Sequence, residues 1–150
     1  MRITYSEDFQ LNERNSFNKK ALNKAIDIMN NTDKDIILLG GDYTNWEGKV
    51  IPFFTEFQKV KKPEYGIYSV TGNHDYSNHT LVLEMIEKTG IKNLDNEKTE
   101  IEKNGQKIII AGVEDLWFGN PDAEKVLEDA DKKDFVIFLS HNPDYFEEMA

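Results

Sequence analysis

Three short clusters of polar residues carry the side chains that could do chemistry in this sequence: Asp42, the run 73–75 (Asn-His-Asp) and His141. Together they offer carboxylate oxygens, an amide oxygen and imidazole nitrogens, with no sulfur. Such a set suits Mn, Fe or Zn better than Cu(I), and it is richer in nitrogen than Ca or Mg usually prefers. The residue types therefore predict a site for divalent metal ions.

The same residue types suggest a reaction. A carboxylate has two oxygens and can bridge two metal ions, and paired ions about 3.5–4 Å apart are a device for hydrolysing phosphoesters. The ions clamp the phosphate oxygens and lower the pKa of a bound water. Metals would also supply the positive charge that an acidic chain lacks, so the expected substrate is a phosphoester.

The elements around the three clusters place them at one edge of a sheet. Each cluster directly follows a short apolar run typical of a buried strand, at residues 36–39, 67–70 and 135–139. Ligands of open α/β sheets bind at the carboxyl ends of the strands. If the strands are neighbours, Asp42, Asn73, His74 and His141 therefore converge on one crevice, and Gly41 and Gly72 allow the backbone to approach closely.

Helical patterns alternate with these strands, which predicts an α/β fold. The pair Asn104-Gly105 between two strand-like runs predicts a type I′ hairpin, so the sheet is expected to be mixed. One helical face is expected to bury Phe17, Ala21, Leu22, Ala25, Ile28 and Met29, and a second buries Val50, Phe53, Phe54, Phe57 and Val60. The helices are expected at residues 16–31, 49–61, 79–89, 121 to about 130, and from 143 onward.

Composition limits the class of protein. The chain has 150 residues with 18 Lys+Arg, 28 Asp+Glu and a formal charge of −10, which fits one domain and argues against binding of nucleic acid or anionic membranes. The absence of cysteine excludes disulfides and thiolate chemistry. No apolar run is long enough for a membrane span. Glycine-rich nucleotide loops are also absent, and nothing in the sequence sets an oligomeric state.

From about residue 16 to its end, the sequence resembles the calcineurin-like metallophosphoesterases. The resemblance rests on Gly-Asp-Tyr-Thr-Asn at 41–45, on Gly-Asn-His-Asp at 72–75, and on the later His141 in Leu-Ser-His-Asn-Pro-Asp. It implies a four-layer α-β-β-α sandwich with a mixed sheet. It also implies a metal-dependent hydrolase that acts on phosphomonoesters or phosphodiesters with a metal-activated hydroxide.

The resemblance also assigns roles. Asp42 would bridge two metals, and Asn73 and His141 would bind the second one. His74 would protonate the leaving group or stabilise the phosphoryl oxygens, and Asp75 would hold the His74 ring and raise its basicity. The side chain of Asn45 would support the ligands from behind.

Two motifs of the family are absent as written. No histidine precedes His74 and none follows His141, so there is neither an early Asp-x-His nor a late Gly-His-x-His. Asp8-Phe9-Gln10 is a degenerate candidate for the first, although the expectation is that the native first strand and its motif lie upstream of Met1. The late motif would lie beyond Ala150. We therefore expect an incomplete domain that holds one metal or none.

An incomplete domain has consequences for function. Little or no activity is expected from the 150 residues alone, and the alternative is a non-catalytic remnant that binds one metal or a protein partner. The location would be cytoplasmic, or at a membrane through a missing N-terminal segment. The 16 Lys against 2 Arg, with many Asn and Ile, suggest an AT-rich bacterial genome.

Four further residues have competing interpretations. His79 is expected to be exposed at a helix end, without a functional role. Trp117 and Phe118 are expected to pack in the core, in preference to lining a substrate pocket. Asp115 is a weak candidate for supporting the ligands or contacting substrate.

Overall fold

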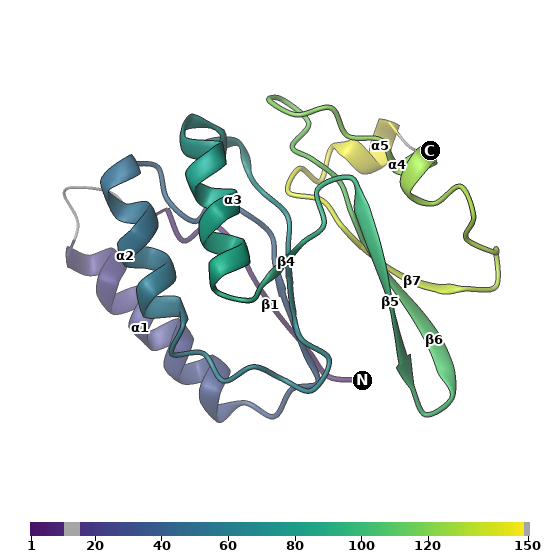
Figure 1. Cartoon of the computed structure of the whole chain (residues 1–150), viewed down its shortest axis with the longest axis horizontal. Helices are drawn as coiled ribbons and strands as arrows, with labels where there is room; N and C mark the ends of the chain where they lie inside the picture. Colours follow the sequence, from purple (N-terminus) through teal and green to yellow (C-terminus); the bar gives the residue numbers. More distant parts are fainter. Residues whose placement is uncertain (11–15, 149–150) are drawn as a thin grey trace.

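The computed structural model describes residues 1–10 and 16–148, and it shows two sheets packed face to face between two layers of helices (Figure 1). The first sheet is parallel, in the order β1 (Ile3–Ser6), β2 (Ile36–Leu39), β3 (Ile67–Ser69) and β4 (Lys92–Asn93). In the second sheet β5 (Glu97–Lys103) is antiparallel to β6 (Gln106–Gly112), which is parallel to β7 (Phe135–Leu139). The expected α-β-β-α architecture with a mixed sheet is confirmed.

The helices cover the outer faces of the two sheets. Three longer helices lie on the first sheet: α1 (Ser16–Asn31), α2 (Glu47–Phe57) and α3 (His79–Lys88), the last preceded by the 3₁₀ helix η1 (Asn73–Asn78). Two short helices, α4 (Ala123–Val126) and α5 (Tyr145–Glu148), lie on the second sheet. None of the helices in the described part of the chain has the length and hydropathy needed to span a bilayer.

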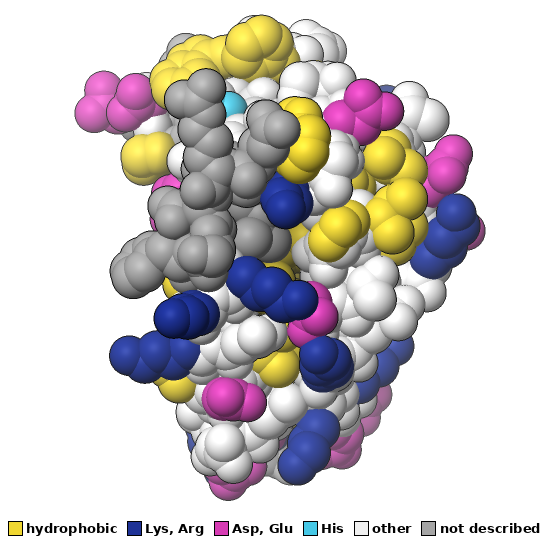
Figure 2. Space-filling model, turned by 90° about the vertical axis from the view of Figure 1, so that its left-hand side faces the viewer, with side chains coloured by type: hydrophobic (Ala, Val, Ile, Leu, Met, Phe, Trp, Pro, Cys, Tyr) yellow, Lys and Arg dark blue, Asp and Glu magenta, His cyan; other side chains and the backbone are white. Residues whose placement is uncertain are grey.

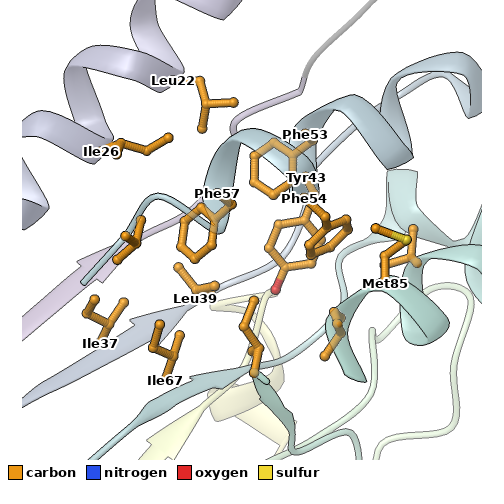
Figure 3. Close-up of a cluster of buried hydrophobic side chains, with 14 of the residues drawn as sticks. Leu22, Ile26, Ile37, Leu39, Tyr43, Phe53, Phe54, Phe57, Ile67 and Met85 are labelled. Atoms are coloured by element: carbon orange, nitrogen blue, oxygen red, sulfur yellow. The ribbon is translucent and has the colours of Figure 1, made fainter. Parts of the chain in front are cut away.

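Apolar side chains fill the space between the sheets and the space under the helices. The cluster between the sheets contains Ile36, Leu38, Tyr68, Val70, Leu94, Ile110 and Leu139. The larger cluster joins α1, α2 and α3 to the first sheet, and its aromatic centre is Tyr43, Phe53, Phe54 and Phe57 (Figure 3). Both faces of β2 and β3 are therefore buried, which explains their unbroken apolar sequence.

Figure 2 shows hydrophobic side chains at the upper end of one face, near a histidine, and charged side chains over much of the rest of that face. The parallel strands run toward this upper end in Figure 1.

Several local predictions hold, and some do not. Asn104 and Gly105 both have positive φ, 55° and 76°, as a type I′ turn requires. In α1 the buried face is Leu22, Ile26 and Met29, whereas Ile28 is 55% exposed, because the core contact follows a strict i, i+4, i+7 spacing.

The helix expected to reach about residue 130 ends at Val126. The segment after it is acidic and offers few apolar side chains to bury.

The strand expected upstream of Met1 has a counterpart within the chain. Ile3–Ser6 pairs in parallel with β2, from the pair Ile3 and Ile36 to the pair Ser6 and Leu39. The strand lies at the edge of the sheet, where Ile3 and Tyr5 are about half exposed at 46% and 51%. A half-exposed edge strand needs no continuous apolar run, which is why its sequence pattern is weak.

A buried carboxylate ties the two sheets together at the opposite end of the strands. Asp35 directly precedes β2. Its carboxylate accepts a hydrogen bond of 2.6 Å from the backbone N–H of Arg2 and forms an ion pair of 2.8 Å with Lys103 of β5. The hydrogen bond from Lys103, followed by that from Arg2, holds the pKa of Asp35 well below its usual range. The negative charge of Asp35 therefore favours the folded state.

We expect Asp35→Asn to lower the free energy of unfolding at pH 7. A carboxyl whose pKa is depressed by folding stabilises above its unfolded pKa, and this contribution is lost as the pH falls through the folded value. The deficit of the variant should therefore shrink below a pH of about 4. Urea unfolding from pH 3 to 7 measures it. Asp33→Asn removes the same charge from an exposed partner of Arg2 and should change little; a deficit independent of pH would contradict the linkage.

A second prediction compares two phenylalanines. Phe57 is 2% exposed within the aromatic cluster, whereas Phe135 at the start of β7 is 62% exposed. Replacement of a buried phenylalanine with alanine leaves a cavity and should cost about 3–5 kcal/mol. The same change at Phe135 should stay within about 0.5 kcal/mol. Equal losses in urea unfolding would show that the cluster under α2 is not the main core.

Candidate metal centre

Two loops meet in close contact beyond the carboxyl ends of β2 and β3. Gly41 has a φ of +96°, and a Cβ atom there would lie 2.4 Å from the backbone nitrogen of Gly72. A Cβ atom on Gly72 would lie 2.3 Å from Oδ1 of Asp42 and 2.8 Å from Cε1 of His141. Only glycine allows this approach, so the two glycines bring the three polar clusters together, as their sequence positions predicted.

The carboxylate of Asp75 fastens these loops from beneath. Its Oδ2 accepts the backbone N–H groups of Asp42 (2.8 Å) and Gly72 (3.0 Å), and its Oδ1 accepts that of Tyr43 (3.0 Å). Burial raises the pKa of Asp75 to about 6 against the opposing effect of the three N–H groups. Asp75 thus binds backbone amides instead of the His74 ring, which differs from the role that the family resemblance implied.

Asp42 is buried in a backbone conformation that is uncommon for a residue with a side chain. Its φ is +57° and its exposure is 1%. Oδ1 accepts the backbone N–H of His74 at 3.0 Å, and Oδ2 accepts the side-chain N–H of Gln10 at 3.1 Å. The left-handed backbone is held by its neighbours, and such strain is found mainly at functional sites.

His141 presents one ring nitrogen to the same point. Its Nδ1 lies 2.7 Å from the carbonyl oxygen of Gly40 and donates a hydrogen bond to it. Its Nε2 lies 3.2 Å from Oδ1 of Asn73 and 3.6 Å from Oδ1 of Asp42. With the proton of a singly protonated ring on Nδ1, the lone pair of Nε2 points toward these two oxygen acceptors. A cation placed between the three atoms would satisfy all of them.

The segment after β1 brings another carboxylate to this point. Phe9 packs against Phe53 and Phe57, with ring centroids 5.2 and 6.4 Å apart, and so anchors the segment on the core. The backbone N–H of Asp8 bonds to the carbonyl of Gly41. Ligand atoms of Asp8, Asp42 and His141 lie within 4.8 Å of one another.

These residues fit a divalent metal ion. Carboxylate oxygens from Asp8 and Asp42, the amide oxygen of Asn73 and Nε2 of His141 form the oxygen and nitrogen set expected from the sequence. The hydrogen bond from Nδ1 of His141 to a carbonyl is the usual support of a metal-binding histidine. The sequence ranked Asp8 low, yet the structure brings it to the other candidates.

Gln10 is the contact that the sequence analysis did not foresee. Its side-chain nitrogen lies 3.3 Å from Oδ1 of Asp8 and 3.1 Å from Oδ2 of Asp42, so its amide N–H groups bridge the two carboxylates. The sequence signal for this contact was the place of Gln10 in Asp8-Phe9-Gln10, the degenerate candidate for Asp-x-His.

His74 stands at the outer side of the centre. Its side chain is 44% exposed, and its Nε2 lies 3.9 Å from Oδ2 of Asp42. The backbone N–H bond to Asp42 fixes the residue while the ring faces solvent. The ring is therefore accessible to a ligand.

The remaining candidates lie away from the centre. Asn45 is exposed, and no hydrogen bond among the described residues joins it to a ligand. Asp115 is fully buried and accepts the backbone N–H groups of Trp117 and Phe118. His79 begins α3, as expected, but its side chain is only 30% exposed, because its Nε2 lies 3.9 Å from Asp95 and its ring stacks on Tyr76.

Comparisons with known proteins identify the family and the fold. A family model described as calcineurin-like phosphoesterase matches residues 8–149. The crystal structure of the phosphopantetheinyl hydrolase of Mycobacterium tuberculosis superposes with a TM-score of 0.61 at 11% identity, covering 95% of this chain and 68% of that one. A hypothetical protein from Thermus thermophilus gives a TM-score of 0.53 at 17% identity, over 92% and 56%. At these low identities the two structures show the fold alone.

Curated relatives include proteins named as phosphodiesterases or as carriers of a metallophosphoesterase domain. The phosphodiesterase YaeI of Escherichia coli is 32% identical over 127 residues, 77% of this chain and 43% of that protein. A zebrafish transmembrane protein with a metallophosphoesterase domain is 27% identical over 137 residues, 83% of this chain and 31% of that protein. The chain thus spans less than half the length of these relatives. On the match of the family model, it belongs to the calcineurin-like phosphoesterases, a family of hydrolases that act on phosphoester bonds.

Proposed function

We propose that this chain binds a divalent metal ion through Asp8, Asp42, Asn73 and His141 and hydrolyses a phosphoester beside it. The observation that carries the proposal is the meeting of acceptor atoms at one point: ligand atoms of Asp8, Asp42 and His141 within 4.8 Å, and Oδ1 of Asn73 at 3.2 Å from His141. A bound divalent ion activates water and polarises the phosphoryl group.

The protein's own residues supply the remaining steps. His74 lies at the open side of the centre, where its ring can donate a proton to the leaving oxygen or a hydrogen bond to the phosphoryl oxygens. Asp42 accepts the His74 backbone N–H at 3.0 Å, which holds the backbone of His74 beside the ligand carboxylate. Asp75 holds the two loops together through its three hydrogen bonds to backbone N–H groups.

A second candidate is a non-catalytic chain that holds one metal. The side chain of Gln10 supports it, because its N–H groups bridge Asp8 and Asp42, where a second cation would otherwise neutralise the carboxylates. An amide N–H can balance charge in part but cannot coordinate a metal. Low activity, expected from the histidine count, is compatible with both candidates.

Metal titration tests the ligand set. We expect the full chain to bind one equivalent of Mn²⁺ by calorimetry, and His141→Ala to weaken binding by at least about tenfold, because the ligand and its support are lost together. His79→Ala is the matched control, since it removes a histidine outside the ligand group. If His141→Ala and His79→Ala bind Mn²⁺ as the unchanged protein does, the proposed centre is wrong.

The role of His74 is tested separately. We expect His74→Asn to leave the Mn²⁺ affinity within about twofold while it lowers Mn²⁺-dependent hydrolysis of bis-p-nitrophenyl phosphate by about 10²–10⁴-fold, the usual contribution of a positioned acid. A parallel loss of metal affinity would instead make His74 a ligand. Metal binding by the unchanged chain without any hydrolysis would favour the second candidate.

A further inference from the structure

Two neighbouring aromatic side chains, Trp117 and Phe118, stand in solvent. They are 64% and 63% exposed, although the sequence analysis expected them in the core. Large exposed aromatic groups lose the free energy that burial would give them, so a folded chain gains from covering them. Their exposure leaves both side chains available to a ligand.

A network of backbone contacts fixes the turn that carries the pair. Oδ1 of the buried Asp115 accepts the N–H groups of Trp117 (3.0 Å) and Phe118 (2.9 Å). The N–H of Leu116 bonds to the side-chain oxygen of Asn142 at 2.8 Å. Asn142 directly follows His141, so the turn is fastened to the strand end that supplies a metal ligand.

The other side of the turn touches the segment that carries His74. The Phe118 ring lies 6.1 Å from the ring of Tyr76, and a Cβ atom on Gly119 would lie 2.4 Å from the Tyr76 hydroxyl. Tyr76 is two residues after His74 in η1 and stacks on His79 with centroids 4.3 Å apart. Phe118 is therefore in contact, through Tyr76, with the segment that carries His74.

We propose that Trp117 and Phe118 form a platform for a planar aromatic ring of the substrate, so that the preferred substrates are phosphoesters of ring-bearing alcohols, such as a nucleoside or a phenol. The inference rests on the proposed function, because the phosphate would be held at the metal centre beside the platform. The chain carries a formal charge of −10, and its ligand carboxylates repel anions. Uncharged contacts add affinity without working against this charge, and stacking of rings is such a contact.

Binding of three monoesters by calorimetry with Mn²⁺ present tests the ring preference. We expect phenyl phosphate to bind about tenfold more tightly than methyl phosphate, the size of effect typical of stacking on an aromatic residue. Cyclohexyl phosphate has the same apolar size without a planar face and should bind more weakly than phenyl phosphate. Equal binding of phenyl and cyclohexyl phosphate, or of phenyl and methyl phosphate, would overturn the inference.

Matched variants place the effect on the turn. Trp117→Ala and Phe118→Ala should each reduce the preference for phenyl over methyl phosphate, and the double variant should abolish it. Phe135→Ala is the control, because this phenylalanine is equally exposed (62%) but begins β7, at the opposite end of the strand from His141. An unchanged preference in the double variant, or an equal loss in Phe135→Ala, counts against the platform.

A metal-free arm separates this inference from the proposed function. Adenosine carries a planar aromatic ring without a phosphate, and ribose has no aromatic ring and no phosphate, so we expect adenosine but not ribose to shift the Trp117 indole N–H signal in NMR spectra. This shift without Mn²⁺ binding would keep the platform and reject the metal centre. Mn²⁺ binding with no response to adenosine and no preference for phenyl phosphate would keep the metal centre and reject the platform.

Discussion

The buried carboxylate of Asp75 is the interaction on which the rest of the centre depends. Burying a carboxylate is costly unless its oxygens are satisfied, and here three backbone N–H groups from two separate loops satisfy them. The same bonds force the loops after β2 and β3 together, which requires glycine at positions 41 and 72. The left-handed backbone of Asp42 follows from this constraint. The candidate metal ligands are therefore placed by an anchor that does not itself face the metal.

The convergence of acceptors has an energetic consequence. Asp42, Asn73 and His141 direct oxygen and nitrogen lone pairs at one point, and Asp8 adds another carboxylate nearby. Without a cation or a shared proton such an arrangement opposes folding, since like partial charges face one another in a partly buried place. The stability must come from elsewhere, and the aromatic cluster under α2 and the filled space between the sheets provide it. A rigid core that supports an unfavourable polar edge is the usual form of a functional site.

The sequence predicted the parts of the fold that depend on strong local signals. The apolar runs of β2, β3 and β7, and the Asn104-Gly105 turn, each specify one conformation. The edge strand β1 lacked such a signal, because half of its side chains face solvent. The partners of Asp75 could not be read from the motif, since the same spacing allows a carboxylate to face either a ring or backbone amides. Trp117 and Phe118 are exposed against expectation: hydrophobicity alone predicts burial, whereas hydrogen bonds to Asp115 hold their backbone in a turn.

Each of the two sheets supplies different residues of the site. The first sheet brings Asp8, Asp42 and Asn73 through adjacent parallel strands, so their spacing follows from strand pairing. The second sheet brings His141 at the end of β7 and holds the Trp117–Phe118 turn through Asn142. A shift of one sheet against the other would therefore move His141 and the aromatic turn together relative to the carboxylates. Because Ile36, Leu38, Ile110 and Leu139 interlock between the sheets, such a shift would disrupt the packed interior, and this packing fixes the separation between the metal centre and the aromatic pair.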